Sequence, residues 1–441
     1  MTTHTDLPRQ LSLLDSTMIN VGSMIGSGIF IVPATIAMYL DSTSLVILVW
    51  TVGGIISLFG ALSVAELGPL MPNSGGQFVY LREAYGPLWG FLYGWTAFTV
   101  IMSASIAAIA VGFATYLGYF FPLDMVGVRI VAITSIIFLT AINCLGAKVG
   151  AMVQNSFTFL KIAALAILVV FSFALSGGST SNFIPILPSV PLTSLVSPLG
   201  IAMVAVLWSY DGWIEITYVA GEVKSPERNI HRSLILSTLI VILVYILVNL
   251  AFTYVLSLST MSRSQLVASD AATVILGPSG ASFVAATVIV STFGANNGFV
   301  FTGARIYYAM AKEGLFFRLL ARVDPHFQTP IPSLISQGLW ASLLVLSGTF
   351  QQLFTYVIFA SWIFYAMSCG AVLVLRKRSP ELPRQYRAWG YPVTPIVFIL
   401  FAVGLVLNTV LENPRDAAIG GGMIILGVPA YYYWARRGRS A

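Results

Sequence analysis

The chain is built from long apolar segments separated by short polar stretches, and this alternation continues from residue 12 to residue 435. A helix needs about 20 predominantly apolar residues to cross a bilayer. Twelve segments meet this requirement, which predicts an all-α integral membrane protein with twelve transmembrane helices. The spans are expected near residues 12–40, 44–70, 86–117, 127–146, 154–176, 194–220, 232–257, 281–311, 333–348, 352–375, 393–411 and 418–435.

Composition supports a membrane protein. Hydrophobic residues make up 57% of the 441-residue chain and charged residues only 9%, against roughly 25% charged in an average soluble domain. The polar start MTTHTDLPRQ runs directly into the first apolar segment, so we expect that segment to remain as an anchor. Cys144 and Cys369 both fall within apolar segments, so neither a disulfide framework nor a metal site is expected, and no cofactor is expected.

The distribution of basic residues predicts the orientation in the membrane. If residues 1–11 and 436–441 are cytoplasmic tails, 18 of the 22 Lys and Arg residues fall on the cytoplasmic side, as the positive-inside rule requires. The exceptions are Arg129, Arg263 and Arg415 outside, and Lys161 within a span. We therefore expect a multi-pass plasma-membrane protein whose basic loops are solvated or contact anionic lipids. This arrangement explains the net charge of +6 without a nucleic-acid surface.

The first span is interrupted by the sequence GSMIGSGIF at residues 22–30. A glycine inside a helix costs about 0.5–1 kcal/mol relative to alanine, so three of them favour local unwinding. The sixth span is interrupted in a similar way by WSYDGW, where Ser209, Asp211 and Gly212 break the apolar run. Interrupted segments at corresponding places in two halves of a transporter are the best sequence indication of a central binding site.

The two interrupted spans occupy equivalent places in two five-span halves, expected at residues 12–176 and 194–375 and followed by a last pair of spans at 393–435. An odd number of crossings gives the halves opposite orientations, which predicts a five-plus-five inverted repeat.

Unwinding a helix within the membrane frees N–H groups at the start of its second half and C=O groups at the end of its first half. Such N–H groups suit a carboxylate and the C=O groups suit an ammonium, so a zwitterionic amino acid satisfies both breaks. The alternative is that the glycines serve close packing between helices.

Four motifs in order resemble the L-type amino acid transporter family of the amino acid–polyamine–organocation superfamily. They are GSMIGSGIFIVP, AELGPLMPNSGGQFVYLREAYG, WSYDGW and STFGANNGFVFTGARIYYAM. The resemblance implies a LeuT-like fold of twelve helices with broken helices 1 and 6, and sodium-independent exchange of amino acids by alternating access. Small neutral amino acids are the expected substrates. The loop YFFPLDMVGV lacks the cysteine that links animal members to a heavy chain, so a stand-alone carrier of the bacterial type is expected.

The resemblance also assigns roles at the two breaks. The backbone of Ser27, Gly28 and Ile29, with Gly26, would receive the substrate carboxylate. The carbonyls of Trp208, Ser209 and Asp211 would receive the amino group, and Trp208 takes the place of an aromatic gate, where it is bulkier than the more common Phe. The remaining candidate substrate-binding positions flank the breaks and are Ser23, Ile25, Tyr210 and Gly212.

Lys161 is the basic residue farthest inside a span, where a lysine costs about 2.5–3.5 kcal/mol to insert. Its side chain would either extend to interfacial water or occupy the place where sodium-coupled relatives bind sodium. The resemblance favours the second interpretation, in which the ammonium binds carbonyls of the broken first span and couples the break to transport.

Expectations also exist for six further polar residues. Asp211 is interpreted as the N-cap of the second half of span six, with proton carrier and counter-charge as alternatives. Glu66 is expected to fix the loop below span two, and the role of Glu215 is open. Asn296 is a candidate for coupling or gating, with packing of Asn296 or Asn297 as the alternative. Tyr254 on span seven is a candidate gate residue.

Other functions were weighed against exchange. Proton-coupled symport, possibly of cationic amino acids through Asp211, is the alternative within transport. An intramembrane enzyme is disfavoured because no HExxH pattern occurs and His4, His231 and His326 lie outside the spans. A channel or a receptor is disfavoured by the lack of a continuous polar path and of large loops.

Overall fold

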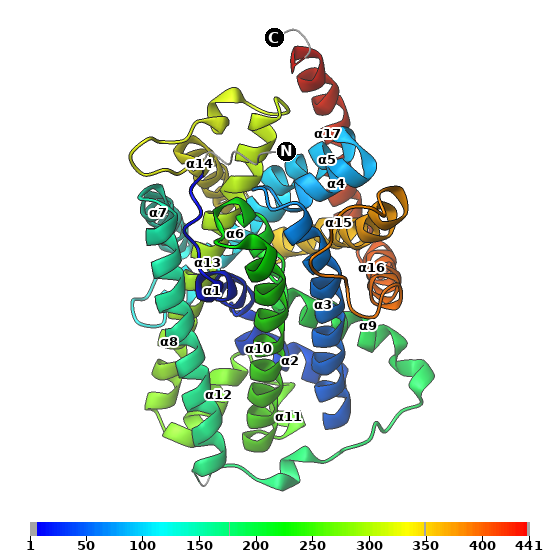
Figure 1. Ribbon diagram of the computed structural model, residues 1–441. Coiled ribbons are helices and arrows are strands. Elements are labelled where there is room, and N and C mark those ends of the chain that lie inside the picture. Colours follow the sequence, from blue (N-terminus) through cyan, green and yellow to red (C-terminus); the bar gives the residue numbers. More distant parts are fainter. Residues whose placement is uncertain (1–6, 176, 348–349, 439–441) are drawn as a thin grey trace.

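The computed structural model describes residues 7–175, 177–347 and 350–438, and these residues form helices without any β-strand (Figure 1). Eight of the described helices are long and apolar enough to cross a membrane, or nine when the bent pair α1–α2 is counted as one span. Each of the twelve expected spans contains at least one helix, which confirms the predicted all-α membrane fold.

The helices follow one another along the chain with short connections. In the first half they are α1 (Leu13–Met24), α2 (Gly28–Tyr39), α3 (Thr43–Leu70), α4 (Gln77–Tyr85), α5 (Pro87–Thr96), α6 (Met102–Leu117), α7 (Met125–Cys144) and α8 (Ala147–Ala174). A π-helical turn (Ala97–Ile101) joins α5 to α6 into one span. In the rest of the chain they are α9 (Val196–Ser209), α10 (Pro226–Val255), α11 (Leu258–Met261), α12 (Val267–Leu276), α13 (Ser279–Lys312), α14 (Ile331–Ser347), α15 (Phe350–Arg378), α16 (Val393–Glu412) and α17 (Pro414–Gly438).

Span six departs from the prediction because no α-helix follows the break. After α9 the chain continues in turns and two short 3₁₀ segments, Glu215–Thr217 and Ala220–Glu222. Gly212 has a φ of +104°, which a helix does not allow. The freed backbone is satisfied from outside: the side chain of Asn20 in α1 accepts a hydrogen bond from the N–H of Ile216. The predicted boundaries also shift, since α8 begins at Ala147 and α10 at Pro226.

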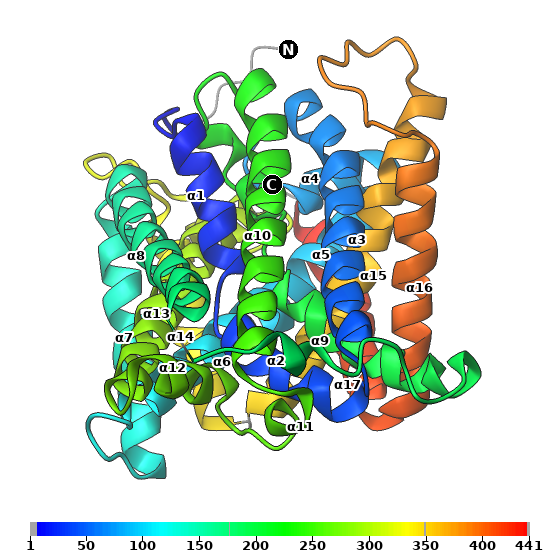
Figure 2. The ribbon, with the colours of Figure 1, turned by 90° about the horizontal axis from the view of Figure 1, so that it is seen from below.

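Helices α1 and α10 lie at the centre of the molecule, with α7 and α8 on one side and α3, α15 and α16 on the other (Figure 2). Helix α13 packs against α1, α6 and α8. The two broken spans therefore meet in the middle of the bundle, where long helices surround them.

The start of span one is bonded to the end of span six. The N–H groups of Gln10 and Leu11 donate to the main-chain oxygen of Glu222 over 2.8 and 2.9 Å, and the N–H of Lys224 donates to Leu11 over 2.8 Å. The Glu222 carboxylate forms a fully buried ion pair with Arg305 of α13, at 2.7 Å. Arg305, counted with the cytoplasmic cations in the sequence, is thus a buried residue of span eight.

Candidate functional site

The first break leaves backbone donors at the start of α2. Residues 25–27 are not helical, and the N-cap Ser27 makes no side-chain capping bond. Within the described part of the chain, the N–H groups of Ser27, Gly28 and Ile29 have no hydrogen-bond partner. Since these groups lie at the positive end of a helix, they form a site suited to a carboxylate.

The carbonyl groups of the first break are bound by Lys161 of α8. Its Nζ lies 2.9 Å from the oxygen of Gly22, 2.7 Å from that of Ile25 and 2.9 Å from that of Ser291 in α13. The three N–H donors of an ammonium match these three acceptors, and the carbonyl end of α1 favours a cation. Lys161 is fully buried, so the interpretation that it extends to interfacial water is wrong.

Tyr245 of α10 joins the two breaks. Its hydroxyl lies 2.8 Å from the main-chain oxygens of both Met24 and Ser209, and donates its single proton between them. The breaks are also in direct contact, because a Cβ added to Gly28 would lie 2.5 Å from Oγ of Ser209. The ends of α1 and α9 therefore meet the start of α2 at one level of the bundle.

A cavity of about 40 Å³ lies between the breaks. Seven of the eleven predicted substrate-binding residues line it, and they come from both broken spans. These residues are Ser23, Gly26, Ser27, Gly28, Trp208, Ser209 and Asp211.

The other four predicted substrate-binding residues lie outside the cavity lining. Ile25 and Ile29 are fully buried, and the main-chain oxygen of Ile25 binds Lys161. The hydroxyl of Tyr210 donates to the main-chain oxygen of Trp50, so Tyr210 belongs to the aromatic core. Gly212 packs against Ser23, since a Cβ added to Gly212 would lie 2.9 Å from the Cβ of that serine.

The candidate gating residues lie in three different environments. Trp208 lines the cavity, as described. Tyr254, near the end of α10, packs against Phe173 and Phe183 and does not line the cavity. Asn296 is buried, and its Oδ1 has no hydrogen-bond partner among the described residues.

Asn297 is the packing residue of the Asn296–Asn297 pair. Its side chain donates to the oxygen of Gly150 and to Gln154 in α8, and accepts from Asn143 in α7. It thus links three helices by hydrogen bonds, as expected for one member of the pair.

Asp211 does not cap a helix, so the favoured N-cap interpretation is wrong. No α-helix begins after it, and its Oδ1 accepts a hydrogen bond from the hydroxyl of Tyr365 at 2.6 Å. Asp211 also lines the cavity. Glu215, four residues after Asp211, is buried and accepts a hydrogen bond from the hydroxyl of Thr302 in α13.

The three glycines of the first break serve different purposes. A Cβ on Gly22 would clash with Nε2 of Gln154, and a Cβ on Gly28 would clash with Ser209 as described. At Gly26 the nearest heavy atom is the Cβ of Ala295, at 3.8 Å. The packing alternative therefore holds for Gly22 and Gly28, whereas Gly26 is open towards the cavity.

Sequence reasoning missed six residues of the cavity lining. They are Met24, Ser105, Ala108, Ile109, Phe299 and Val357. Three of them belong to α6, where the run SASIAAIA of small residues could have indicated a close approach. Phe299 lies in the motif of span eight, but an apolar side chain there carries no signal that separates cavity from core.

Comparison with known proteins agrees with this geometry. The family described as amino acid permease matches residues 11–433. The serine/threonine exchanger SteT of Bacillus subtilis is 32% identical, over 98% of both chains. The human b(0,+)-type amino acid transporter 1 is 31% identical over 97% of this chain and 88% of its own length. The mouse large neutral amino acids transporter small subunit 2 is 32% identical over 98% of this chain and 82% of its own length. The chain belongs to the amino acid permease family of the amino acid–polyamine–organocation superfamily, and its fold is the twelve-helix, five-plus-five inverted repeat of that superfamily.

Proposed function

We propose that this permease exchanges small neutral amino acids across the plasma membrane by alternating access, independently of sodium. The observation that carries the proposal is the set of unpartnered N–H groups at Ser27, Gly28 and Ile29, which lies across a small cavity from the carbonyl end of α9. A zwitterion fits this arrangement, with its carboxylate at the start of α2 and its ammonium near Trp208, Ser209 and Asp211.

The size of the cavity supports small substrates. Since one water needs a cavity of roughly 10–15 Å³, a cavity of about 40 Å³ holds about three waters. Trp208 and Phe299 contribute bulky aromatic side chains to its wall. The Bacillus relative is a serine/threonine exchanger, which agrees with substrates of this size.

Lys161 supports independence from sodium. Its Nζ binds the carbonyls of Gly22, Ile25 and Ser291, and this occupies the oxygens that a sodium ion would need. The positive charge at these carbonyls belongs to a side chain of the protein, so it does not depend on the sodium concentration.

The remaining parts of the proposal concern the whole chain. The permease works as a carrier rather than an enzyme, without a cofactor and without a disulfide-linked heavy chain. Residues 12–176 and 194–375 form the two inverted halves, and both termini lie in the cytoplasm of a bacterial cell. The excess of Lys and Arg on one side supports this orientation.

Proteoliposomes test the exchange. We expect uptake of labelled serine only when the vesicles contain an amino acid, with no change when sodium is replaced by choline. Competition by all twenty amino acids, with and without internal substrate, then defines the substrate range. Uptake into empty vesicles at the same rate would contradict exchange, and inhibition by tryptophan as strong as by alanine would contradict the preference for small substrates.

A second candidate function is proton-coupled uptake, and one observation favours it. Asp211 lines the cavity, and its carboxylate forms no ion pair with any described cation. A carboxylate in this position could carry a proton with the substrate or attract a cationic side chain. Uptake into empty vesicles driven by an inward proton gradient, and abolished in Asp211→Asn, would establish this function in place of exchange.

A further inference from the structure

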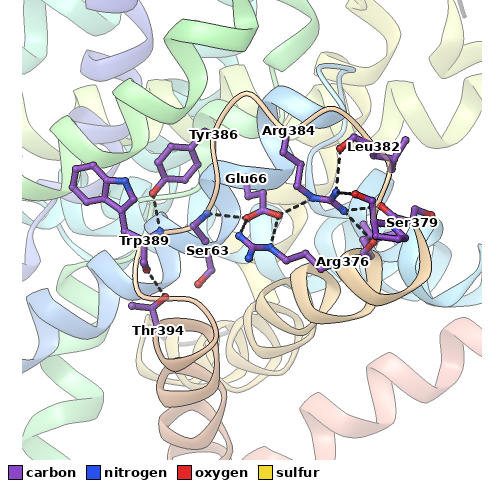
Figure 3. A network of polar contacts seen from close by, with 12 residues as sticks. Ser63, Glu66, Arg376, Ser379, Leu382, Arg384, Tyr386, Trp389 and Thr394 are labelled. Carbon is purple, nitrogen blue, oxygen red and sulfur yellow. Dashed lines mark hydrogen bonds and ion pairs between the residues drawn. The ribbon is translucent and has the colours of Figure 1, made fainter.

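A buried carboxylate holds together the connection between α15 and α16 at one end of the molecule (Figure 3). Glu66, near the end of α3, accepts hydrogen bonds from Nε and Nη2 of Arg376 at 2.9 and 2.5 Å, and from the N–H of Ala388 at 2.8 Å. Arg384 approaches the same carboxylate at 3.0 Å. The loop that Glu66 fixes is therefore the one between spans ten and eleven, and not the loop below span two as the sequence suggested.

The loop is fixed internally as well. The guanidinium of Arg384 donates to four main-chain oxygens of the segment, those of Leu375, Ser379, Pro380 and Leu382. The guanidinium of Arg376 lies 3.7 Å from the ring centre of Tyr391. Two arginines thus share one carboxylate, and this cluster retains an excess positive charge in a loop of defined shape.

The same loop exposes apolar side chains that continue a stripe on α16. Trp389 is 67% exposed and Val393 61% exposed. The stripe continues with exposed residues three or four positions apart, which are Ile396, Leu400, Val403 and Leu407. In a membrane-spanning helix such a face contacts lipid, so Trp389 lies where the stripe reaches the membrane–water interface, a depth that Trp prefers.

Three further cations precede Trp389 in this segment. Lys377 and Arg378 end α15, and Arg387 lies two residues before Trp389. All three side chains are exposed, and none forms an ion pair with another described residue. Figure 2 shows the loop (orange) at the outer edge of the molecule, beside α16 and at the end of the bundle where α1 starts.

We propose that the segment from Arg376 to Val393 binds an anionic phospholipid of the adjoining bilayer leaflet. Lys377, Arg378 and Arg387 contact the phosphate headgroup, while Trp389 and the α16 stripe contact the acyl chains. A soluble anion would use the cations alone, and a protein partner would leave the lipid-facing stripe unexplained. Because Glu66 bonds this loop to α3, the lipid-binding segment is fixed to the helical bundle.

Native mass spectrometry of the full chain in neutral detergent tests the proposal. We expect the protein to retain phosphatidylglycerol in preference to phosphatidylcholine. The triple variant Lys377→Gln, Arg378→Gln, Arg387→Gln should bind phosphatidylglycerol on the order of a hundredfold more weakly, since each basic residue near a headgroup contributes roughly fivefold. Trp389→Ala should weaken the binding of phosphatidylglycerol, and the variant should show no preference for phosphatidylcholine.

A matched triple variant serves as the control. Lys148→Gln, Arg232→Gln, Arg318→Gln removes three exposed cations near helix ends elsewhere in the chain and should keep the affinity of the unmodified chain. Equal losses in the two triple variants, or none in the first, would overturn the proposal. Displacement of phosphatidylglycerol by equimolar inorganic phosphate would identify a free anion as the occupant and overturn it as well. If the triple variant folds poorly, the lipid-binding measurement is repeated with the single variant Arg387→Gln. Unfolding followed by fluorescence checks that this variant is folded.

Discussion

At the scale of single residues, Gly26 and Gly28 lie two positions apart in the first break and have opposite surroundings. Gly28 contacts the second break through Ser209, whereas a Cβ on Gly26 would meet only the Cβ of Ala295, at 3.8 Å. The same residue type therefore serves close packing at one position and access to the cavity at the other.

We expect Gly28→Ala to destabilise the protein and Gly26→Ala to leave its stability unchanged. The new Cβ at position 28 would lie 3.1 Å from the Cα of Ser209, so the backbone has to shift. Overpacking of this kind costs about 1–3 kcal/mol. Thermal unfolding in detergent measures the difference, and equal unfolding temperatures of the two variants would show that the breaks are not in contact.

A second residue-scale prediction concerns Lys161. Lys161→Ala leaves the oxygens of Gly22, Ile25 and Ser291 without their donor, and we expect transport to fall by more than about tenfold, or ~1.4 kcal/mol. The protein should still insert and purify. Lys148→Ala, which alters an exposed lysine of the same helix, is the control, and uptake by Lys161→Ala at the rate of this control would exclude a role in transport.

The sequence predicts part of the site at this scale and misses part of it for a physical reason. Gly26 and Asp211 were found because a glycine or a carboxylate within a membrane span is unusual and needs a cause. Phe299 and Val357 were not found, because an apolar residue is favourable both in a cavity wall and in a core. Met24 contributes a main-chain oxygen to Tyr245, and backbone groups leave no trace in residue type.

At the scale of elements, α10 joins the two broken spans through the hydroxyl of Tyr245. Tyr245→Phe removes only this hydroxyl, which binds Met24 and Ser209. A hydrogen bond contributes about 1 kcal/mol net, so exchange should slow by roughly five- to tenfold. Tyr254→Phe on the same helix, outside the cavity lining, should exchange at the original rate. A slower rate in Tyr254→Phe alone would assign the gate to that residue instead.

The connection between α15 and α16 gives another prediction for an element. Glu66→Gln removes a buried charge that Arg376 and Arg384 share, and breaking a buried ion pair costs about 3–5 kcal/mol. Hydrogen exchange should become faster in residues 379–392, while the helices on either side stay protected. Glu381→Gln alters an exposed carboxylate of the same loop. Equal effects of both variants would show that Glu66 does not fix the loop.

Helix existence was predictable along most of the chain because lipid demands a long apolar run for each crossing. The lack of an α-helix in the second half of span six was not predictable, because its residues ITYV are as apolar as those of a helix. Its conformation depends instead on the positive φ of Gly212 and on Asn20, which supplies a hydrogen-bond acceptor from another span. A partner distant in sequence decides the local structure there.

At the scale of the whole molecule, the even number of spans and the basic loops predict one arrangement of the termini. We expect a green fluorescent protein fused after Ala441 to fluoresce and an alkaline phosphatase fused at the same place to be inactive, as for a cytoplasmic C-terminus. Fusions within residues 177–195, between α8 and α9, should give the reverse pattern. An active phosphatase at the C-terminus would require an odd number of crossings or the opposite orientation.

The bonds between residues 10–11 and 222–224 have a mechanical consequence for the transport cycle. Together with Tyr245, they attach span one to span six at two levels, at the breaks and at the end where residue 11 meets residue 223. Two segments joined at two levels cannot tilt independently, so spans one and six move together. Any such tilt also strains their contact with α13, where Glu222 of span six forms its ion pair with Arg305.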